Sequence, residues 1–270
     1  MVLNNSIKIL IQSLMEGYFF MRIVLQKEGP YIAIITIENP NKLNAMTRSM
    51  MKDLGDLWDE LGQDDTRCVI ISGAGNRAFC VGADISGDLD ATPDLAKTVN
   101  HSLLKTDVFN KPVIAAVNGD CVGGGIELLL STDIRCAPLT ARFGLPEVKW
   151  SIYPFGGATT KLIHQIGYVH AMDLLLTGRL ITAEEAKKIN LINAIVDPGS
   201  ALDWAIERAR IIASNSPSAV QAVKTQISAT IAEHTLSRED LEQTLGDQVR
   251  ANVNFKEGVA AFLEKRHPRY

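Results

Sequence analysis

The sequence has few of the residues that mark disulfide-stabilised proteins and metalloproteins. Its 270 residues include four cysteines, Cys68, Cys80, Cys121 and Cys136, and none of them forms a C-x-x-C pair. In a chain of this length, scattered cysteines are typical of reduced residues in a cytoplasmic protein. The five histidines are scattered too, so no His/Cys cluster has metal-ligand spacing. We therefore expect no metal site.

Positive charge and long apolar runs are also scarce. The chain has 27 basic and 31 acidic residues, a formal net charge of −4, and no basic run. Nucleic-acid-binding surfaces usually need a basic excess, so we expect no nucleic-acid partner. No uncharged apolar run approaches the ~18–20 residues that span a bilayer, so we expect no membrane association. The apolar fraction of 46% is typical of a globular protein with one or two domains.

The N-terminal 20 residues differ from the rest of the chain. The stretch from Ile7 to Met21 is rich in apolar residues, with Lys8 and Glu16 as its only charges. It lacks the basic segment and the small-residue cleavage site of a signal peptide. Since a strand-like pattern begins just after Met21, residues 1–20 are interpreted as an extension or as an artefact of the assigned start site.

Residues 21–200 show the mixed pattern of an α/β core. Buried or alternating apolar runs predict strands over 22–27, 31–38, 67–72, 112–118, 132–137 and 194–196. A helix is predicted from Thr47, a good N-cap, and further helical segments over 126–130, 169–176 and 182–188. Residues 201–270 are predicted to be helical throughout, so the chain divides into a core and a helical C-terminal region.

Two C-terminal helices have predicted apolar faces. In the first, Leu202, Ile206, Ala209 and Ala213 share a side. The second is predicted to start at Ser216-Pro217, since proline is favoured at the first helical position. Its face continues through Val220, Val223, Ile227 and Ile231.

One glycine-rich segment resembles a dinucleotide-binding fingerprint but lacks its context. Residues 73–78 fit G-x-G-x-x-A after a buried strand. The fingerprint requires a helix to open there, whereas Phe79-Cys80-Val81-Gly82 follows. We therefore expect a glycine-rich turn and loop, which can present backbone N–H groups to an anion or an oxyanion.

Two glutamates stand among apolar residues and near glycines. Glu127 follows Gly123-Gly124-Gly125, and Glu147 follows Leu145-Pro146. Burial raises the pKa of a carboxyl and suits it to proton transfer. The alternatives are that the glycines serve helix–sheet packing and that Glu127 reaches solvent or a basic partner. Together the two carboxyls and the glycine loops favour acid/base chemistry beside an oxyanion hole.

Several segments, in order, resemble the crotonase, or enoyl-CoA hydratase/isomerase, superfamily. They are Asn39–Ala45, Gly73–Ile85, Lys111–Gly119, Gly123–Leu128, Ala141–Glu147, Leu176–Arg179 and Phe262–Arg266. The resemblance covers residues 22–270. It implies a spiral of ββα units over residues 21–200 and a helical trimerisation region over 201–270, with a homotrimer or a hexamer as the assembly. It also implies an acyl-CoA thioester substrate and no separate cofactor, because coenzyme A is part of the substrate.

The resemblance also implies roles for individual residues. The amides of Ala83 and Gly124 match the oxyanion-hole donors, and Glu127 and Glu147 match the two hydratase carboxylates. The joint presence of both glutamates favours reversible hydration of a 2-enoyl-CoA. The substrate-binding residues it implies are Lys42, Leu43, Ala45, Gly82, Asp84, Ile85, Phe155, Phe262 and Lys265, the last two from a neighbouring subunit.

One segment departs from the hydratase pattern. Where the family usually has Pro-Gly-Ala-Gly-Gly-Thr, this chain has Pro154-Phe155-Gly156-Gly157-Ala158-Thr159. The Phe155 backbone N–H remains able to hold the water, whereas its ring is expected to narrow or redirect the acyl pocket. A double-bond isomerase or a specialised acyl-CoA dehydratase on the same scaffold stays open. A non-catalytic relative that binds RNA is disfavoured by the net negative charge.

Overall fold

The computed structural model describes residues 21–84 and 93–270 of the chain. The proposed extension over residues 1–20 and the predicted binding residue Ile85 lie outside the described residues. The four cysteines are buried and unpaired, as expected from their scattered positions.

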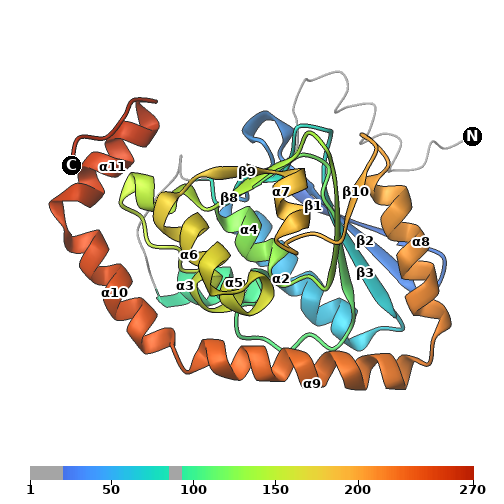
Figure 1. The fold of residues 1–270 in the computed structure, drawn as a ribbon. Coiled ribbons are helices and arrows are strands. Elements are labelled where there is room, and N and C mark those ends of the chain that lie inside the picture. The colour runs from blue at the N-terminus through green and yellow to red at the C-terminus, as the bar shows by residue number, and fades with distance from the viewer. Residues whose placement is uncertain (1–20, 85–92) are drawn as a thin grey trace, which may run out of the picture.

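Six strands form the larger sheet, in the order β1-β2-β3-β5-β7-β10 (Figure 1). Their bounds are β1 Arg22–Glu28, β2 Ile32–Glu38, β3 Cys68–Gly73, β5 Val113–Ala116, β7 Ile134–Pro138 and β10 Ala194–Val196. The first two pair antiparallel, and every later pair in this sheet is parallel. All six strands predicted from apolar runs are therefore present, with ends within two residues of prediction.

A second sheet of four short strands has the order β4-β6-β8-β9. The strands are β4 Ala78–Cys80, β6 Asp120–Val122, β8 Arg142–Gly144 and β9 Leu180–Thr182. The sequence did not predict this sheet, and part of the loop expected after Gly73 is strand β4. Three residues are too few to show an alternating pattern, so the sheet depends on pairing between distant segments.

Helices cover both faces of the larger sheet. On one face lies α2 (Arg48–Gln63), which begins as predicted, with the Thr47 hydroxyl accepting the Met50 amide at 3.2 Å. It packs against β1 and against α3 (Pro93–Ser102). On the other face lies α8 (Ala201–Ser214), which contacts β3, β5 and β7. The apolar side chains of β2, β3 and β5 therefore alternate between two core clusters.

The buried face of α8 includes the predicted Ala209 and Ala213, with the predicted Ile206 partly buried against it, but it does not include Leu202. Leu202 is 37% exposed, and the residues packed on the sheet are Ala201, Ala205, Ala209 and Ala213. This stripe has a spacing of four residues, which keeps it on one side of the helix. The pattern of larger apolar residues pointed to Leu202 because alanine carries little hydrophobic weight in a sequence.

The remaining helices before the C-terminal region are short. They are α4 (Gly124–Leu129), α5 (Ala158–Ile166), α6 (Tyr168–Thr177), α7 (Ala183–Lys188), and the 3-10 helices η1 (Pro40–Lys42) and η2 (Pro146–Trp150). The helices predicted over 126–130, 169–176 and 182–188 correspond to α4, α6 and α7. Thr182 caps α7 as expected, since its hydroxyl accepts the Glu185 amide at 3.2 Å.

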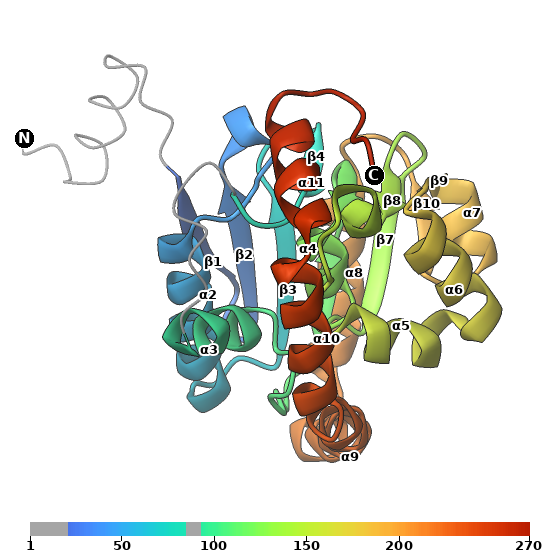
Figure 2. The ribbon, with the colours of Figure 1, turned by 90° about the vertical axis from the view of Figure 1, so that its left-hand side faces the viewer.

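Three helices end the chain: α9 (Pro217–Leu236), α10 (Glu239–Ala251) and α11 (Val253–Leu263). In Figure 1 they run below the core and then up its left side, and Figure 2 shows α10 and α11 crossing in front of α4. Helix α11 packs on η2, and α9 packs on α5. The predicted start at Ser216-Pro217 is confirmed, although the Ser216 side chain makes no capping bond. Within the described residues, none of the helices is long and apolar enough to cross a membrane.

Candidate active site

Glu127 lies on α4, which starts directly after the end of β6. Its side chain is buried, with 6% of the residue exposed. The Gly156 amide donates a hydrogen bond of 2.6 Å to its Oε1 atom. Burial raises the pKa of Glu127 to about 7, although the Gly156 bond acts in the opposite direction. The expectation that Glu127 is buried is therefore confirmed.

The glycines before Glu127 have separate reasons to be glycine. Gly123 has φ = +60°, a backbone conformation that other residues adopt only at a cost. A Cβ atom at Gly125 would overlap the carbonyl oxygen of Cys80 in β4. Gly125 thus serves the helix–sheet packing that the sequence left open as an alternative.

Glu147 lies on η2, on the other side of the same glycines. A Cβ atom built on Gly123 would lie 3.1 Å from its Oε1 atom. Its Oε2 atom is buried and has no hydrogen-bond partner among the described residues. Burial, and then the charge of Glu127, raise the pKa of Glu147 to about 8. The structure therefore brings the two predicted carboxyls into one site.

Two backbone segments approach each other beside this pair of glutamates. A Cβ on Gly82 would lie 2.9 Å from the Gly124 nitrogen, and a Cβ on Gly124 would lie 3.7 Å from the Ala83 nitrogen. Only glycine at both positions lets the backbones come this close. In the described part of the chain, neither the Ala83 nor the Gly124 amide donates to a backbone or side-chain acceptor. Both donors are thus available to a ligand.

The loop over residues 42–46 lies against the segment that carries Ala83. The Met46 amide donates to the Gly82 carbonyl at 2.8 Å, and the Asp84 amide donates to the Met46 carbonyl at 2.9 Å. Lys42 and Asp84 form an ion pair of 2.7 Å between Nζ and Oδ2. The residues predicted to bind substrate, Lys42, Leu43, Ala45, Gly82 and Asp84, are therefore brought together at one edge of the site.

Asn44 organises this edge, and the sequence analysis did not assign it a role. Its Oδ1 atom accepts the Asn39 amide at 3.0 Å. Its Nδ2 atom donates to the carbonyls of Ala74 at 3.0 Å and Ala78 at 2.7 Å. Asn44 is buried and has φ = +58°, which asparagine tolerates better than most residues. Its place within the Asn39–Ala45 motif was the available signal.

Comparison with known proteins decides the family. A family model described as enoyl-CoA hydratase/isomerase matches residues 27–270. The chain belongs to this family. An enoyl-CoA hydratase of Mycobacterium tuberculosis is 41% identical over 255 residues, which cover 92% of this chain and 95% of that protein. A short-chain-enoyl-CoA hydratase of Clostridium acetobutylicum is 35% identical, with 90% of this chain and 95% of that protein covered.

The fold of a solved structure agrees. A carnitinyl-CoA hydratase from Mycobacterium avium superposes with a TM-score of 0.86 at 32% identity, covering 93% of this chain and 98% of that one. The chain therefore has the crotonase fold that the motifs predicted, and it is an enoyl-CoA hydratase-like enzyme. The rejection of the dinucleotide fingerprint is consistent with β4 at the position where such a fingerprint would open a helix.

Three further predicted residues of this family member lie at the C-terminal helices. The Phe155 ring lies 5.2 Å from the Tyr153 ring and 5.0 Å from the Arg250 guanidinium, and it packs against Gly246 of α10. The amide of the next residue, Gly156, contacts Glu127. The role predicted for the Phe155 amide, holding the water, stays a prediction. Phe262 on α11 is half-exposed and meets Trp150 edge-on at 5.3 Å, and Lys265 follows α11 at the surface.

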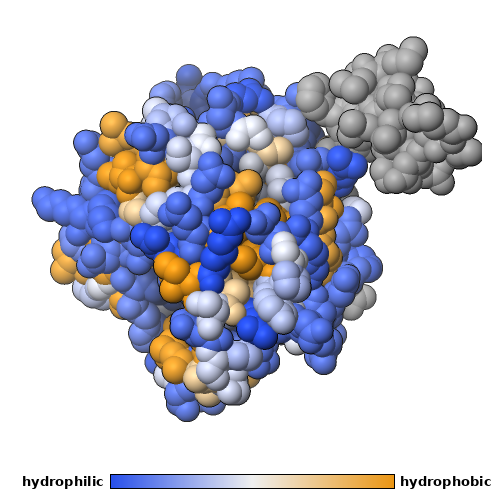
Figure 3. All heavy atoms as spheres, turned by 90° about the vertical axis from the view of Figure 1, so that its right-hand side faces the viewer, coloured by the Kyte–Doolittle hydropathy of each residue, from blue (hydrophilic) through white to orange (hydrophobic). Residues whose placement is uncertain are grey.

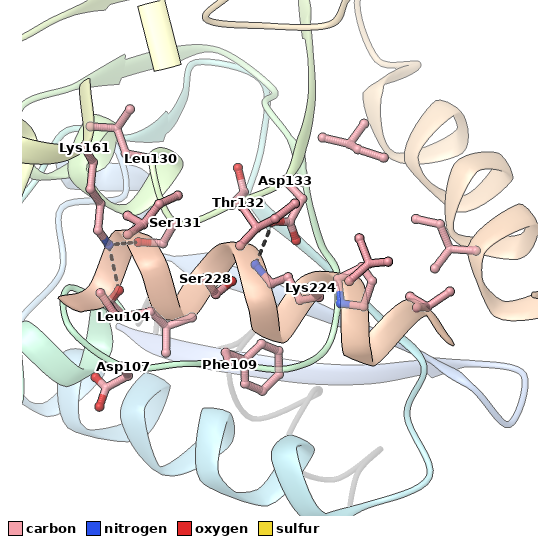
Figure 4. A pocket seen from close by; sticks show the side chains of 18 of the residues that line it. Leu104, Asp107, Phe109, Leu130, Ser131, Thr132, Asp133, Lys161, Lys224 and Ser228 are labelled. Atoms are coloured by element: carbon pink, nitrogen blue, oxygen red, sulfur yellow. Dashed lines mark hydrogen bonds and ion pairs between the residues drawn. The ribbon is translucent and has the colours of Figure 1, made fainter. Parts of the chain in front are cut away.

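A pocket of about 580 Å³ lies elsewhere, between α9 and the core (Figure 4). None of the predicted site residues lines it. Buried Lys161 forms part of its wall and donates to the Leu104 carbonyl at 2.7 Å and to the Ser131 hydroxyl at 3.0 Å. Burial lowers the pKa of Lys161 to about 7. Across residues 21–84 and 93–270, no three His, Cys, Asp or Glu side chains are grouped as metal ligands.

Proposed function

We propose that the protein catalyses the reversible hydration of a 2-enoyl-CoA to a 3-hydroxyacyl-CoA, with Glu127 and Glu147 as catalytic residues. The observation that carries this proposal is the convergence of two buried carboxyls with raised pKa values on two adjacent backbone amides. A two-carboxylate site with preorganised N–H donors suits proton transfer around an enolate.

The reaction requires charge to develop on the thioester oxygen. As the oxygen of water adds to C3, the C2–C3 π electrons move toward the carbonyl, which becomes enolate-like. The amides of Ala83 and Gly124 are placed to stabilise this oxyanion, and losing one such donor typically costs ~3–4 kcal/mol. Collapse of the enolate then takes a proton at C2, so water has been added across the double bond.

The two glutamates differ in their ability to hold a proton. Glu127 accepts the Gly156 amide, which stabilises its ionised form, whereas Glu147 Oε2 has no partner among the described residues. One proton shared by the pair therefore resides on Glu147. On this basis ionised Glu127 accepts a proton from the attacking water, and protonated Glu147 delivers its proton to C2.

The role of the Gly124 amide in the oxyanion hole can be tested without altering the glutamates. Gly124 is the first residue of α4, where proline is tolerated because its amide has no partner within the helix. Gly124→Pro removes the N–H, and Gly124→Ala keeps it. In both variants the added Cβ would lie 3.1 Å from the Gly82 α-carbon, so this crowding is shared and the comparison isolates the N–H. If this amide stabilises the oxyanion, kcat is about 10²-fold lower for the proline variant than for the alanine variant. Equal rates would remove Gly124 from the oxyanion hole.

The decisive assay follows the loss of the conjugated enoyl-thioester absorbance over a panel of 2-enoyl-CoAs. We expect turnover on at least one of them, and Glu127→Gln and Glu147→Gln should each lower kcat by orders of magnitude with a wild-type circular dichroism spectrum. No turnover on any 2-enoyl-CoA, with activity on a 3-enoyl-CoA, would support a double-bond isomerase. Wild-type rates in both variants would refute the two-carboxylate mechanism.

The names of the relatives span several acyl groups. Among them are a mevalonyl-coenzyme A hydratase of Beauveria bassiana and an (E)-benzylidenesuccinyl-CoA hydratase of Thauera aromatica. These two proteins are 34% and 35% identical to this chain. The shared scaffold therefore supports an acyl-CoA thioester as the substrate class, and the panel above must include branched and aromatic acyl groups.

The edge formed by residues 42–46 and 82–84 is proposed to bind the coenzyme A part of the substrate. Its polar features are the Lys42–Asp84 pair and the loop backbone. Since the chain is acidic overall, a polyanionic ligand must be held by such local groups. Lys42→Ala is expected to raise KM for the acyl-CoA with little change in kcat.

The assembly proposed is a homotrimer, alone or paired into a hexamer. Helix α9 carries Val223 and Ile227 at 63% and 58% exposure, on the wall of the pocket beside the core. Figure 3 draws the face of the molecule that lies on the right-hand side in Figure 1. At its lower end, where α9 lies in Figure 1, apolar surface is visible among hydrophilic residues. Exposed apolar surface of this kind is typical of contacts between subunits. In such an assembly Phe262 and Lys265 are proposed to reach the coenzyme A of a neighbouring subunit.

A further inference from the structure

Lys105 and Glu242 form a buried ion pair between the core and the C-terminal helices. Their side chains are only 3% and 5% exposed, and Lys105 Nζ contacts Glu242 Oε2. Lys105 follows α3, whereas Glu242 lies on α10. Removing two charges from water is costly, so a buried pair of this kind is weak support for stability alone. Its position therefore invites a functional explanation.

The pair touches the segment that holds the catalytic carboxyl Glu127. The Gly156 amide donates to Glu127, and a Cβ on the next residue, Gly157, would lie 3.3 Å from Lys105 Cγ. Two residues further on, the Thr159 hydroxyl donates to Glu242 Oε1 at 3.4 Å. One stretch of four residues thus contacts Glu127, Lys105 and Glu242 in turn.

A second link fixes α10 to the same place. Glu239, one turn before Glu242, lies 3.6 Å from Lys105 Nζ and accepts a hydrogen bond of 2.8 Å from the Asn100 side chain on α3. The Phe155 ring also packs against Gly246, one turn after Glu242. Three successive turns of α10 therefore contact Lys105 or the residues on either side of Gly156.

We propose that Glu242 is a positioning residue that acts on Glu127 through Lys105 and residues 156–159, so that docking of α10 sets both the orientation and the charge environment of the catalytic carboxyl. This inference rests on the proposed role of Glu127 as the group that accepts the proton of water. It adds that Glu127 depends, for this role, on the docking of α10, a helix from the C-terminal part of the chain.

The charges around Glu127 act in opposite directions. Glu242 raises the pKa of Glu127 and Lys105 lowers it, with the effect of Glu242 the larger of the two. The titratable groups that face Glu127 from the packed elements are Glu147 on η2, Tyr153 before α5, Lys161 on α5, Lys105 after α3 and Glu242 on α10. Breaking the pair from either side must therefore shift the ionisation of Glu127, with a sign that depends on which partner is lost.

The experiment measures the pH dependence of kcat/KM in variants of the full-length enzyme. Glu242→Gln leaves Lys105 as the dominant neighbour, so the acid limb moves to lower pH, by about 0.5 unit or more. Lys105→Met leaves Glu242 dominant, so the limb moves to higher pH. The double variant Lys105→Met/Glu242→Gln loses both charges, and its limb lies between those of the single variants. A purely structural role would lower rates without shifts of opposite sign.

A second readout does not need turnover. The carboxyl carbon of Glu127 can be followed by NMR titration in 13C-glutamate-labelled protein, with the signal assigned from its loss in Glu127→Gln. The same opposite shifts are expected. This titration also decides the matter where Lys105→Met folds poorly, because Glu242→Gln alone predicts a lower titration midpoint.

The matched control is the pair formed by Lys111 and Asp64, with a distance of 3.2 Å between Nζ and Oδ1 and a lysine that is equally buried. It is absent from the groups that face Glu127 in the described chain. Asp64→Asn should therefore change stability without moving the acid limb. An unshifted limb and an unshifted Glu127 titration in Glu242→Gln would overturn the inference. An active Glu127→Gln enzyme would instead overturn the role of Glu127 itself.

Discussion

At the scale of single residues, the site depends on glycines as much as on glutamates. Gly156 shows this most directly, because its amide holds Glu127 and its α-carbon faces the carboxylate. A Cβ at this position would overlap Glu127 Oε2 and would lie 2.6 Å from Leu103 Cδ1. The side chain of Glu127 is buried, so any displacement of it must be accommodated by packed neighbours. A methyl group at residue 156 therefore acts on the catalytic carboxyl first, and also on the end of the Leu103 side chain.

We expect Gly156→Ala to lower kcat by about 10²-fold, because a misplacement of about 1 Å in a catalytic group can cost that much. The measurement is steady-state kinetics on the best 2-enoyl-CoA, with thermal unfolding to show that the fold persists. Gly62→Ala is the matched control, since its added Cβ would meet only Phe109 at 3.9 Å, an ordinary contact. Equal kcat in the two variants would contradict the geometry.

The raised pKa of Glu147 carries a stability cost at alkaline pH. Burial raises the pKa to about 8, above the value of the unfolded chain, so the folded state binds this proton more tightly. This proton on Glu147 stabilises the folded state. The stabilisation is fully present below pH ~4.5 and is lost as pH rises through about 8. Glu147→Gln is neutral at every pH and escapes this loss.

Glu147→Gln should therefore match the wild type in free energy of unfolding at pH 5 and exceed it by about 1–3 kcal/mol at pH 9. Urea denaturation at the two pH values provides the measurement. Glu257→Gln tests the sign, because hydrogen bonds from Arg266 lower the pKa of Glu257, so this variant should lose stability at neutral pH. A wild-type-like pH dependence for Glu147→Gln would show that this carboxyl is not strained by folding.

At the scale of elements, η2 carries Glu147 and is held in place by α11. A Cβ at Gly258 would overlap the Trp150 carbonyl oxygen, a backbone atom that cannot rotate away. The Tyr270 hydroxyl also donates to the Lys149 carbonyl at 2.8 Å, and Phe262 meets Trp150 edge-on. The last helix and the chain end thus support the carboxyl that is proposed to protonate C2.

Gly258→Ala should displace α11 from η2, lower kcat/KM by about 10-fold to 10²-fold and expose the chain end to limited proteolysis. Lys256→Ala, on the exposed side of α11, is the control and should leave both readouts unchanged. If Gly258→Ala kept wild-type kinetics while α11 became protease-sensitive, the support of Glu147 by this helix would be refuted.

The sequence predicted the elements that bury long apolar runs and missed those that do not. The strands of the larger sheet and helix α2 follow directly from periodicity, and the motifs around Glu127 and Glu147 located both carboxyls. The three-residue strands of the second sheet contain too little pattern to detect. Three other features depend on contacts between distant segments, which no local pattern encodes. They are the role of Gly156, the hydrogen bonds of the Asn44 side chain and the Lys105–Glu242 pair.

At the scale of the whole molecule, the C-terminal helices connect the site to the outer surface. Helix α11 contacts η2, which carries Glu147, and α10 contacts Phe155 and Thr159, on either side of the amide that Glu127 accepts. Helix α9 lies along the lower edge of the core (Figure 1). The apolar face predicted for α9 includes two residues that the isolated chain leaves exposed, Val223 and Ile227. A face of this kind is expected to be covered by another subunit.

The double variant Val223→Lys/Ile227→Lys is therefore expected to sediment as a monomer under conditions in which the wild-type protein sediments as a trimer or hexamer. Two lysines placed in a packed apolar interface must lose their hydration, which is costly without partners. Sedimentation velocity over a range of concentrations gives the measurement. Val169→Lys on α6, a residue that is more exposed still, adds a charge outside the C-terminal region and should leave the trimer intact. If only Val169→Lys dissociated the assembly, the subunit contact would lie on α6.

The monomeric variant also tests the role of the chain end. If α10 and α11 close the site within one chain while Phe262 and Lys265 contact the coenzyme A of a neighbouring subunit, this variant should keep a folded core yet show a raised KM for the acyl-CoA.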